Sequence, residues 1–242
     1  MKEIIKDLNV KYEQYGEGED VVLLHGWGQN IAMMEPLGNN LFKKFRVTIL
    51  DLPGFGESDE PKEALTIYDY ADVVKRLLDK LKINNPILIG HSFGGRIAIV
   101  YASKYETEKV VLLGAPCVRE KEKESFKVTL LKKLKKVPVL SNFEEFAKKH
   151  IGSEDYKNAS PIMREILVNT VNEDLTGCAL KINCPTLLIW GTNDTEAPLE
   201  DAKKLEKLLK DGGLVTYEGG SHYTYIEFLG PVSNVIKTFI GG

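Results

Sequence analysis

The chain has 242 residues, of which 43% are hydrophobic and 28% charged, a composition typical of a folded protein and unlike that of a disordered one. Its 32 basic and 35 acidic residues give a net charge of −3, so the composition provides no broad positive field for nucleic acid or an anionic membrane. The chain has three cysteines without CxxC spacing, which is typical of a reducing compartment. Its start lacks the apolar core of a signal peptide, and no apolar run approaches the roughly 18 residues that span a membrane. We therefore predict a cytoplasmic protein whose partner is a small molecule.

The first predicted element is an antiparallel edge hairpin, because residues 10–15 alternate in polarity and Gly16-Glu17-Gly18 then leads into a strand at 21–24. That strand and four further runs are apolar on both faces, as parallel strands covered by helices on both sides must be; the four runs are residues 46–50, 86–89, 109–113 and 186–190. Segments with helical periodicity, such as residues 70–81 and 205–209, lie between them. The order predicts an α/β fold with a mostly parallel sheet, mixed at one edge and flanked by helices.

A candidate nucleophile lies in residues 86–99, whose pattern is that of a strand, a sharp turn and a helix around Gly90-His91-Ser92-Phe93-Gly94. A turn of this G-x-S-x-G kind strains the serine backbone and exposes its hydroxyl above the strand ends, and it needs glycines where a Cβ would clash. The alternatives are a serine that only caps the helix, or a phosphate-binding turn. Neither P-loop spacing nor a dinucleotide fingerprint is present, so we predict that Ser92 is the nucleophile.

Residues 115–176 contain no run of the buried-strand type, and their apolar residues recur at helical spacing. We expect a helical insertion that packs as a lid on one core domain, formed by residues 1–114 and 177–242. Within it, residues 119–136 carry eight basic and three acidic residues on an amphipathic pattern. The favoured interpretation is a lid helix with solvated lysines, and the alternative is contact with a membrane or an anionic substrate.

A serine that attacks an acyl group needs hydrogen-bond donors already aimed at the developing oxyanion. One donor is expected to be the N–H of Phe93, and the second should come from the loop after the strand at 21–24, His25-Gly26-Trp27-Gly28. With these motifs, and with residues 51–59, 191–194 and 219–222, the chain resembles the α/β-hydrolase fold superfamily of small serine esterases and related hydrolases over nearly its whole length. The resemblance implies that the Trp27 N–H is the second donor and that His25 only supports its loop. It also implies a structural role for residues 51–59.

The histidine that would take the proton of Ser92 is expected late in the chain, because this fold orders its triad as serine, acid, histidine. Four histidines occur. His25 precedes the nucleophile, His91 adjoins it and should point away from it, and His150 lies in the predicted lid. His222, in a glycine-rich loop, is therefore the expected base by elimination and by resemblance.

Asp194 is the expected acid, because it follows the strand at 186–190 and precedes Pro198, where the next helix would start. Glu196, two residues later, and Asp211, before the last strand, are the alternatives. The loop after Leu113 has no carboxylate, which removes the acid position that some family members use. No HExxH motif, paired histidines or nucleotide fingerprint occurs, so we expect neither a metal nor a cofactor.

The resemblance implies an enzyme that cleaves small to medium carboxylic esters through an acyl-enzyme. Trp27, Phe93 and the aliphatic residues of the predicted lid suggest an apolar pocket for the acyl group. Carbon–carbon bond, lactone, thioester and amide hydrolases of the same fold stay as alternatives, as does a low-turnover ligand receptor. A serine at position 92 argues against haloalkane dehalogenase chemistry, which uses a carboxylate there. The sequence leaves the oligomeric state open.

Overall fold

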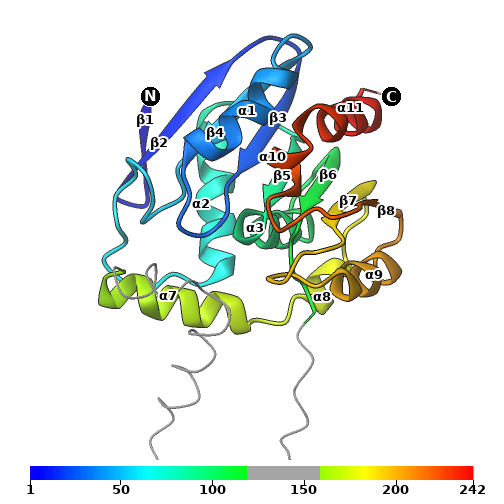
Figure 1. The fold of residues 1–242 in the computed structure, drawn as a ribbon. Coiled ribbons are helices and arrows are strands. Elements are labelled where there is room, and N and C mark those ends of the chain that lie inside the picture. Colours follow the sequence, from blue (N-terminus) through cyan, green and yellow to red (C-terminus); the bar gives the residue numbers. More distant parts are fainter. Residues whose placement is uncertain (119–158, 242) are drawn as a thin grey trace, which may run out of the picture.

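A twisted sheet forms the centre of the computed structural model, which describes residues 1–118 and 159–241 (Figure 1). Within these residues it has eight strands in the order β1-β2-β4-β3-β5-β6-β7-β8. The strands are β1 (Lys2–Ile5), β2 (Leu8–Tyr15), β3 (Glu19–Leu24), β4 (Phe45–Leu50), β5 (Ile87–His91), β6 (Lys109–Leu113), β7 (Thr186–Gly191) and β8 (Gly212–Tyr217). β2 runs antiparallel to β1 and β4, and every neighbouring pair from β4 to β8 is parallel. The predicted fold class, mostly parallel and mixed at one edge, is confirmed.

Strand β2 does not form the predicted hairpin with β3. It lies antiparallel to β4 instead, with Tyr12 opposite Leu50, and β4 separates it from β3. The turn after β2 explains the difference. Gly16 has a φ of 82°, and a Cβ there would lie 2.3 Å from the carbonyl oxygen of Phe45, the first residue of β4. The chain therefore crosses the start of β4 before it enters β3.

Successive residues of the parallel strands are buried on opposite faces of the sheet. Val22 and Leu24 of β3 belong to one apolar core, and Val21 and Leu23 belong to a second one. The first core includes residues of α2 (Ile67–Lys80), α3 (Phe93–Ala102), α8 (Thr176–Ala179) and α9 (Leu199–Leu208), and the second includes residues of α1 (Ile31–Leu41), α10 (Thr224–Glu227) and α11 (Leu229–Ile240). Helices thus cover both faces, which is why these strands are apolar throughout.

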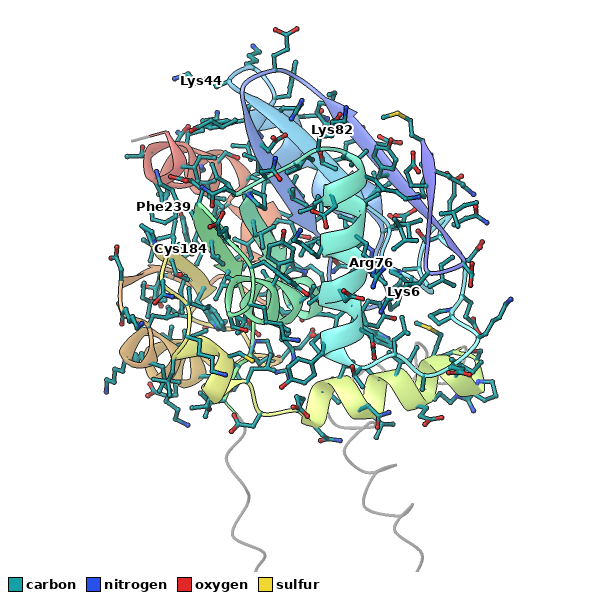
Figure 2. The ribbon with its side chains drawn as sticks, turned by 180° about the vertical axis from the view of Figure 1, so that it is seen from behind. Lys6, Lys44, Arg76, Lys82, Cys184 and Phe239 are labelled. Atoms are coloured by element: carbon teal, nitrogen blue, oxygen red, sulfur yellow. The ribbon has the colours of Figure 1, made fainter. Side chains whose placement is uncertain are left out.

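The polar outer face of helix α2 is linked by an ion pair to the turn between the edge strands β1 and β2. The helix begins at a capping box in which the Thr66 hydroxyl accepts the N–H of Asp69 while the Asp69 carboxylate accepts the N–H of Thr66. On its outer side Asp72 binds Arg76, at 3.0 Å, and also Lys6 from the turn between β1 and β2. Lys6 and Arg76 lie close together in Figure 2. The helix is one turn longer at its start than the predicted segment 70–81.

The described parts of the predicted insertion are residues 115–118 and 159–176, and the second contains α7 (Pro161–Asn172). Arg96 of α3 donates a hydrogen bond of 2.9 Å from Nη2 to the carbonyl oxygen of Thr170, so the end of α7 is held on the core. Met163, on the other end of α7, lies against Gly54, where a Cβ would come 2.3 Å from its sulfur. The basic stretch 119–136 and His150 lie outside the described residues. The lid and its boundaries at 115 and 176 stay a prediction.

Candidate active site

Four loops that carry the predicted site residues leave the carboxyl ends of neighbouring parallel strands. Residues 25–28 follow β3, Ser92 follows β5, Asp194 follows β7 and His222 follows β8. Because parallel strands end on the same edge of a sheet, residues far apart in the sequence meet there, and this edge is where open α/β sheets bind ligands.

Ser92 occupies a strained turn between β5 and α3. Its φ of 49° and ψ of −110° lie outside the regions that residues with a side chain normally adopt, which costs about 1–3 kcal/mol. The backbone N–H of Ser92 donates to the carbonyl oxygen of Leu113 at 2.9 Å, which anchors the turn to β6. The Ser92 side chain makes no capping hydrogen bond to α3. The alternative of a serine that merely caps the helix is therefore wrong.

The glycines of the turn are required by close backbone contacts, as predicted. A Cβ on Gly90 would lie 2.5 Å from the carbonyl group of Gly94. A Cβ on Gly94 would lie 2.2 Å from the carbonyl oxygen of Leu24, the last residue of β3. Both distances are far inside van der Waals contact, and the obstacles are backbone atoms. The turn that exposes Ser92 can therefore form only with glycine at both positions.

Asp194 and His222 are joined by a buried hydrogen bond. His222 Nδ1 lies 2.8 Å from Asp194 Oδ2, and the two side chains are 5% and 1% exposed. The other carboxylate oxygen, Oδ1, accepts the backbone N–H groups of Glu196 and Ala197 at 2.9 and 2.8 Å. With Oδ2 as acceptor, the proton of the neutral imidazole is on Nδ1, and Nε2 carries the lone pair.

The two alternative acids occupy other positions. Glu196 lies on the opposite side of the imidazole, where its Oε2 is 3.6 Å from Nε2 of His222. The carbonyl oxygen of Asp211 accepts the N–H of Thr186, the first residue of β7, so Asp211 lies at the amino-terminal edge of the sheet. The geometry thus favours Asp194 over both.

His222 lies close to the end of β6, the strand that neighbours β5 and the turn at Ser92. A Cβ on Gly114, directly after β6, would lie 3.2 Å from both His222 Nδ1 and Asp194 Oδ2, and Gly114 has a φ of 55°. The same β6 end holds the backbone of Ser92 through Leu113. No hydrogen bond joins Ser92 to His222 in the described part of the chain. The three predicted residues therefore lie at the carboxyl edge of the sheet, and two of them, Asp194 and His222, are joined by a hydrogen bond.

The loop after β3 presents backbone N–H groups at the same place. The ring of His25 holds this loop, since its Nε2 accepts the N–H of Leu52 at 3.0 Å and its Nδ1 donates to Gly26 O at 2.7 Å. Burial lowers the pKa of His25 to about 4, so the ring is neutral. Among the described residues, neither the N–H of Trp27 nor that of Phe93 has a hydrogen-bond acceptor. Within the described residues both amides are thus unpaired, and Phe93 directly follows Ser92.

An aromatic wall adjoins these two amides. The Trp27 ring packs edge-to-face on Phe55 and Phe93, with centroid distances of 4.9 and 5.3 Å, and Tyr70 packs on Phe93 at 5.0 Å. The Tyr70 hydroxyl donates to the carbonyl oxygen of Pro53 at 2.9 Å, which fixes the loop that carries Phe55. Apart from this satisfied hydroxyl and the indole N–H of Trp27, the wall is apolar.

His91 and Gln29 were missed in the sequence as parts of the site. His91 points away from the nucleophile, as predicted, but its Nε2 lies 3.1 Å from the backbone carbonyl oxygen of His222 and its Nδ1 lies 3.2 Å from Gln29 Oε1. Gln29 Oε1 also accepts the N–H of Gly26 at 2.9 Å. Burial, reinforced by the nearby His222, lowers the pKa of His91 to about 3. The contacts of His91 join it to residues 62 and 131 positions away in the chain, so no local pattern could have shown them.

The described residues hold no group of three or more histidine, cysteine, aspartate or glutamate side chains placed to bind a metal ion. Nor does any helix in this part of the chain have the length and apolar character to cross a membrane.

Two parts of the chain match models of known protein families. Residues 21–131 match the model of the alpha/beta hydrolase fold, and residues 168–241 match that of a TAP-like protein. The AB hydrolase superfamily protein YisY of Bacillus subtilis is 30% identical over 257 residues, covering 94% of this chain and 93% of YisY.

Two other similar proteins have names that state a reaction or substrate. The pimeloyl-[acyl-carrier protein] methyl ester esterase of Shewanella woodyi is 38% identical over 117 residues, which are 47% of this chain and 43% of that protein. The structure of a meta-cleavage product hydrolase from Pseudomonas fluorescens IP01 aligns with a TM-score of 0.78 at 23% identity, covering 100% of this chain and 97% of that one. The latter likeness concerns the fold.

Proposed function

Because the chain belongs to the α/β-hydrolase fold family, we propose that it is a serine hydrolase that cleaves small to medium carboxylic esters through an acyl-enzyme intermediate. The observation that carries the proposal is the buried hydrogen bond from His222 Nδ1 to Asp194 Oδ2 at the sheet edge where the partly buried Ser92 lies in its strained turn. A serine hydroxyl is a weak nucleophile until an oriented imidazole accepts its proton.

In this mechanism His222 moves the proton. Nε2 takes the proton of Ser92 Oγ as Oγ bonds to the ester carbonyl carbon, and then gives it to the leaving oxygen as the carbon–oxygen bond breaks. The products of this half are an acyl-serine and an alcohol. Water then attacks the acyl carbon, Nε2 takes one of its protons and returns it to Oγ, and the acid leaves. Asp194 keeps the ring in the Nδ1–H tautomer and stabilises the imidazolium that forms in both halves.

The N–H groups of Trp27 and Phe93 are the proposed oxyanion donors. Both lack an acceptor among the described residues, and the Phe93 N–H also stands at the amino-terminal end of α3, where the helix dipole favours negative charge. Donors held by the backbone need no reorganisation when the charge develops, and one such donor is worth about 3 kcal/mol of transition-state stabilisation.

The aromatic wall supports an apolar acyl group. Trp27, Phe55 and Phe93 adjoin the proposed oxyanion donors, so an acyl chain bound there would lie against rings rather than polar groups. Met163 of α7 stands beside Phe55, on Gly54, which supports a cap formed by residues 115–176. The name of the Shewanella woodyi relative, a methyl ester esterase, is consistent with ester cleavage.

Labelling with a fluorophosphonate probe, followed by mass spectrometry of the modified peptide, tests the nucleophile. We expect the label on Ser92 and none on Ser92→Ala, whereas Ser103→Ala should be labelled like the parent. Ser103 is a suitable control because its hydroxyl, at the far end of α3, binds the carbonyl oxygen of Val100. An unlabelled Ser92 in the folded protein would overturn the proposal.

A panel of p-nitrophenyl esters tests the substrate class. We expect repeated turnovers on acetate and butyrate esters, abolished by Ser92→Ala, and multiple turnovers would also exclude a low-turnover receptor. Faster cleavage of charged acyl groups than of butyrate would contradict the apolar pocket. Cleavage of carbon–carbon, lactone or thioester substrates in preference to all esters would replace the proposed bond while leaving the triad in place.

A further inference from the structure

Glu196 places a carboxylate near Nε2 of His222, the nitrogen that accepts and transfers the proton in the proposed mechanism. Its Oε2 lies 3.6 Å from Nε2 of His222, and its side chain is 51% exposed whereas that of His222 is 5% exposed. The backbone of Glu196 is fixed, because its N–H donates to Asp194 Oδ1 at 2.9 Å. Within the described residues, Glu196 is the charged side chain found within 4.0 Å of Nε2.

This carboxylate is not engaged by the free site. At 3.6 Å the separation exceeds a hydrogen bond, and in the neutral tautomer with its proton on Nδ1 the ring offers Glu196 no N–H at Nε2. The oxygens of Glu196 accept no hydrogen bond from any described residue. The carboxylate is therefore open to a group that approaches Nε2 from solvent.

The group that must approach Nε2 is the leaving alcohol, a step that rests on the proposed function. Nε2 donates its proton to the leaving oxygen, so that oxygen lies at hydrogen-bond distance from Nε2. A substituent two carbons beyond that oxygen can approach Glu196, because Oε2 lies 3.6 Å from the same Nε2, and a charge on the substituent would then interact with the carboxylate. The acyl group, by contrast, lies on the side of the aromatic wall.

A partly exposed aromatic ring stands beside the same imidazole. The ring of Tyr223 packs edge-to-face on that of His222 with a centroid distance of 5.7 Å, and the residue is 38% exposed. Aromatic faces attract ammonium groups, and together with a carboxylate they favour quaternary and protonated amines. Both features favour positive charge on the leaving-group side.

We infer that Glu196 determines leaving-group specificity, so that the protein prefers esters of cationic amino alcohols to esters of neutral alcohols of the same shape. A matched pair of substrates isolates this charge: butyrylcholine and 3,3-dimethylbutyl butyrate have the same acyl group and differ in a quaternary nitrogen against a carbon. The ratio of their kcat/KM values cancels any effect of Glu196 on His222 that both substrates share.

The measurement is that ratio at pH 8 and low ionic strength. Glu196→Gln should lower it by about three- to ten-fold, as expected for a half-exposed charge at this distance, and Glu196→Lys should lower it further. Glu200→Gln is the matched control, because Glu200 is 70% exposed, pairs with Lys203 and follows the same loop. Its ratio should equal that of the parent protein.

Two outcomes would overturn the inference, and they are distinguishable. If the neutral ester is cleaved by the parent and Glu196→Gln leaves the ratio within two-fold of the parent value, the specificity role fails while the proposed function stands. If neither ester is cleaved and Ser92 is not labelled, the proposed function fails and the inference falls with it. Melting curves of the variants confirm that an altered ratio comes from folded protein.

Discussion

The two halves of the candidate site are held together by different forces. Around Ser92 the contacts are steric: glycine backbones pass within distances that exclude a single methyl group, and the serine backbone is strained. Around His222 the contacts are hydrogen bonds between side chains and backbone amides. The first half should therefore tolerate no change of shape, and the second no change of hydrogen bonding. Substitutions of the glycines in the first half should affect folding, and those in the second half should affect chemistry in a folded protein.

The largest expected effect is on chemistry. Asp194→Asn keeps the shape of the side chain but offers His222 a donor or a weaker acceptor, which favours the wrong tautomer. We expect kcat for p-nitrophenyl butyrate to fall by about 10⁴, or about 5.5 kcal/mol of activation free energy, as for a triad aspartate. The melting temperature should change little by comparison.

Asp211→Asn is the matched control, since Asp211 is the alternative acid that lies at the other edge of the sheet. Its kcat should equal that of the parent. A normal kcat in Asp194→Asn, or a lost one in Asp211→Asn, would show that the acid is misassigned.

A smaller effect, on stability, is expected from Gly94→Ala. The new Cβ would lie 2.2 Å from the carbonyl oxygen of Leu24, so β3 and α3 must separate. We expect the free energy of unfolding to fall by about 3 kcal/mol or more, measured by urea denaturation. Gly177→Ala adds the same methyl group where nothing lies within 4 Å, inside α8, and should leave stability unchanged or raise it by up to about 1 kcal/mol. Equal stability of the two variants would contradict the steric account of the nucleophile turn.

The smallest effect concerns the buried histidines behind the nucleophile. Burial lowers the pKa of His25 to about 4 and that of His91 to about 3, against about 6.5 in an unfolded chain. Between these values the unfolded state binds more protons than the folded one, so stability falls as the pH falls below about 6.5. At pH 5 each histidine should cost about 2 kcal/mol relative to pH 7.

Urea denaturation at the two pH values measures this loss, and replacing one histidine should remove its share. His25→Asn is the suitable variant, because an amide can still donate to Gly26 O while carrying no titratable group. Whatever its overall stability, the difference in free energy of unfolding between pH 7 and pH 5 should shrink by about 2 kcal/mol. An unchanged pH dependence would show that His25 is not kept neutral by the fold.

The success of the sequence predictions depended on how local each feature is. The strands at 109–113 and 186–190 were found within one residue of β6 and β7, because a parallel strand covered on both faces must be apolar throughout. The strained turn at Ser92 was predicted because its strand, its glycines and its helix are consecutive, and its role as the nucleophile stays a proposal. The predicted hairpin of β2 with β3 was wrong: β2 lies between β1 and β4, since alternating polarity indicates a strand near the margin of the sheet but not which strands lie beside it.

By itself, the sequence determined the fold class, the position of Ser92 and the order of the proposed triad, because these depend on local backbone requirements and on the chain order that one fold imposes. The sequence predicted Asp194 as the acid and left Glu196, two residues away and chemically alike, as an alternative; only the tertiary structure shows how each carboxylate lies against the His222 ring. One contacts Nδ1 and the other faces Nε2, because the two amides that bind Asp194 turn the chain between them. The bracing of His222 by His91 likewise needed loops from distant parts of the chain to meet. The sequence shows which side chains are present, and the packing of distant loops determines which atoms of those side chains come into contact.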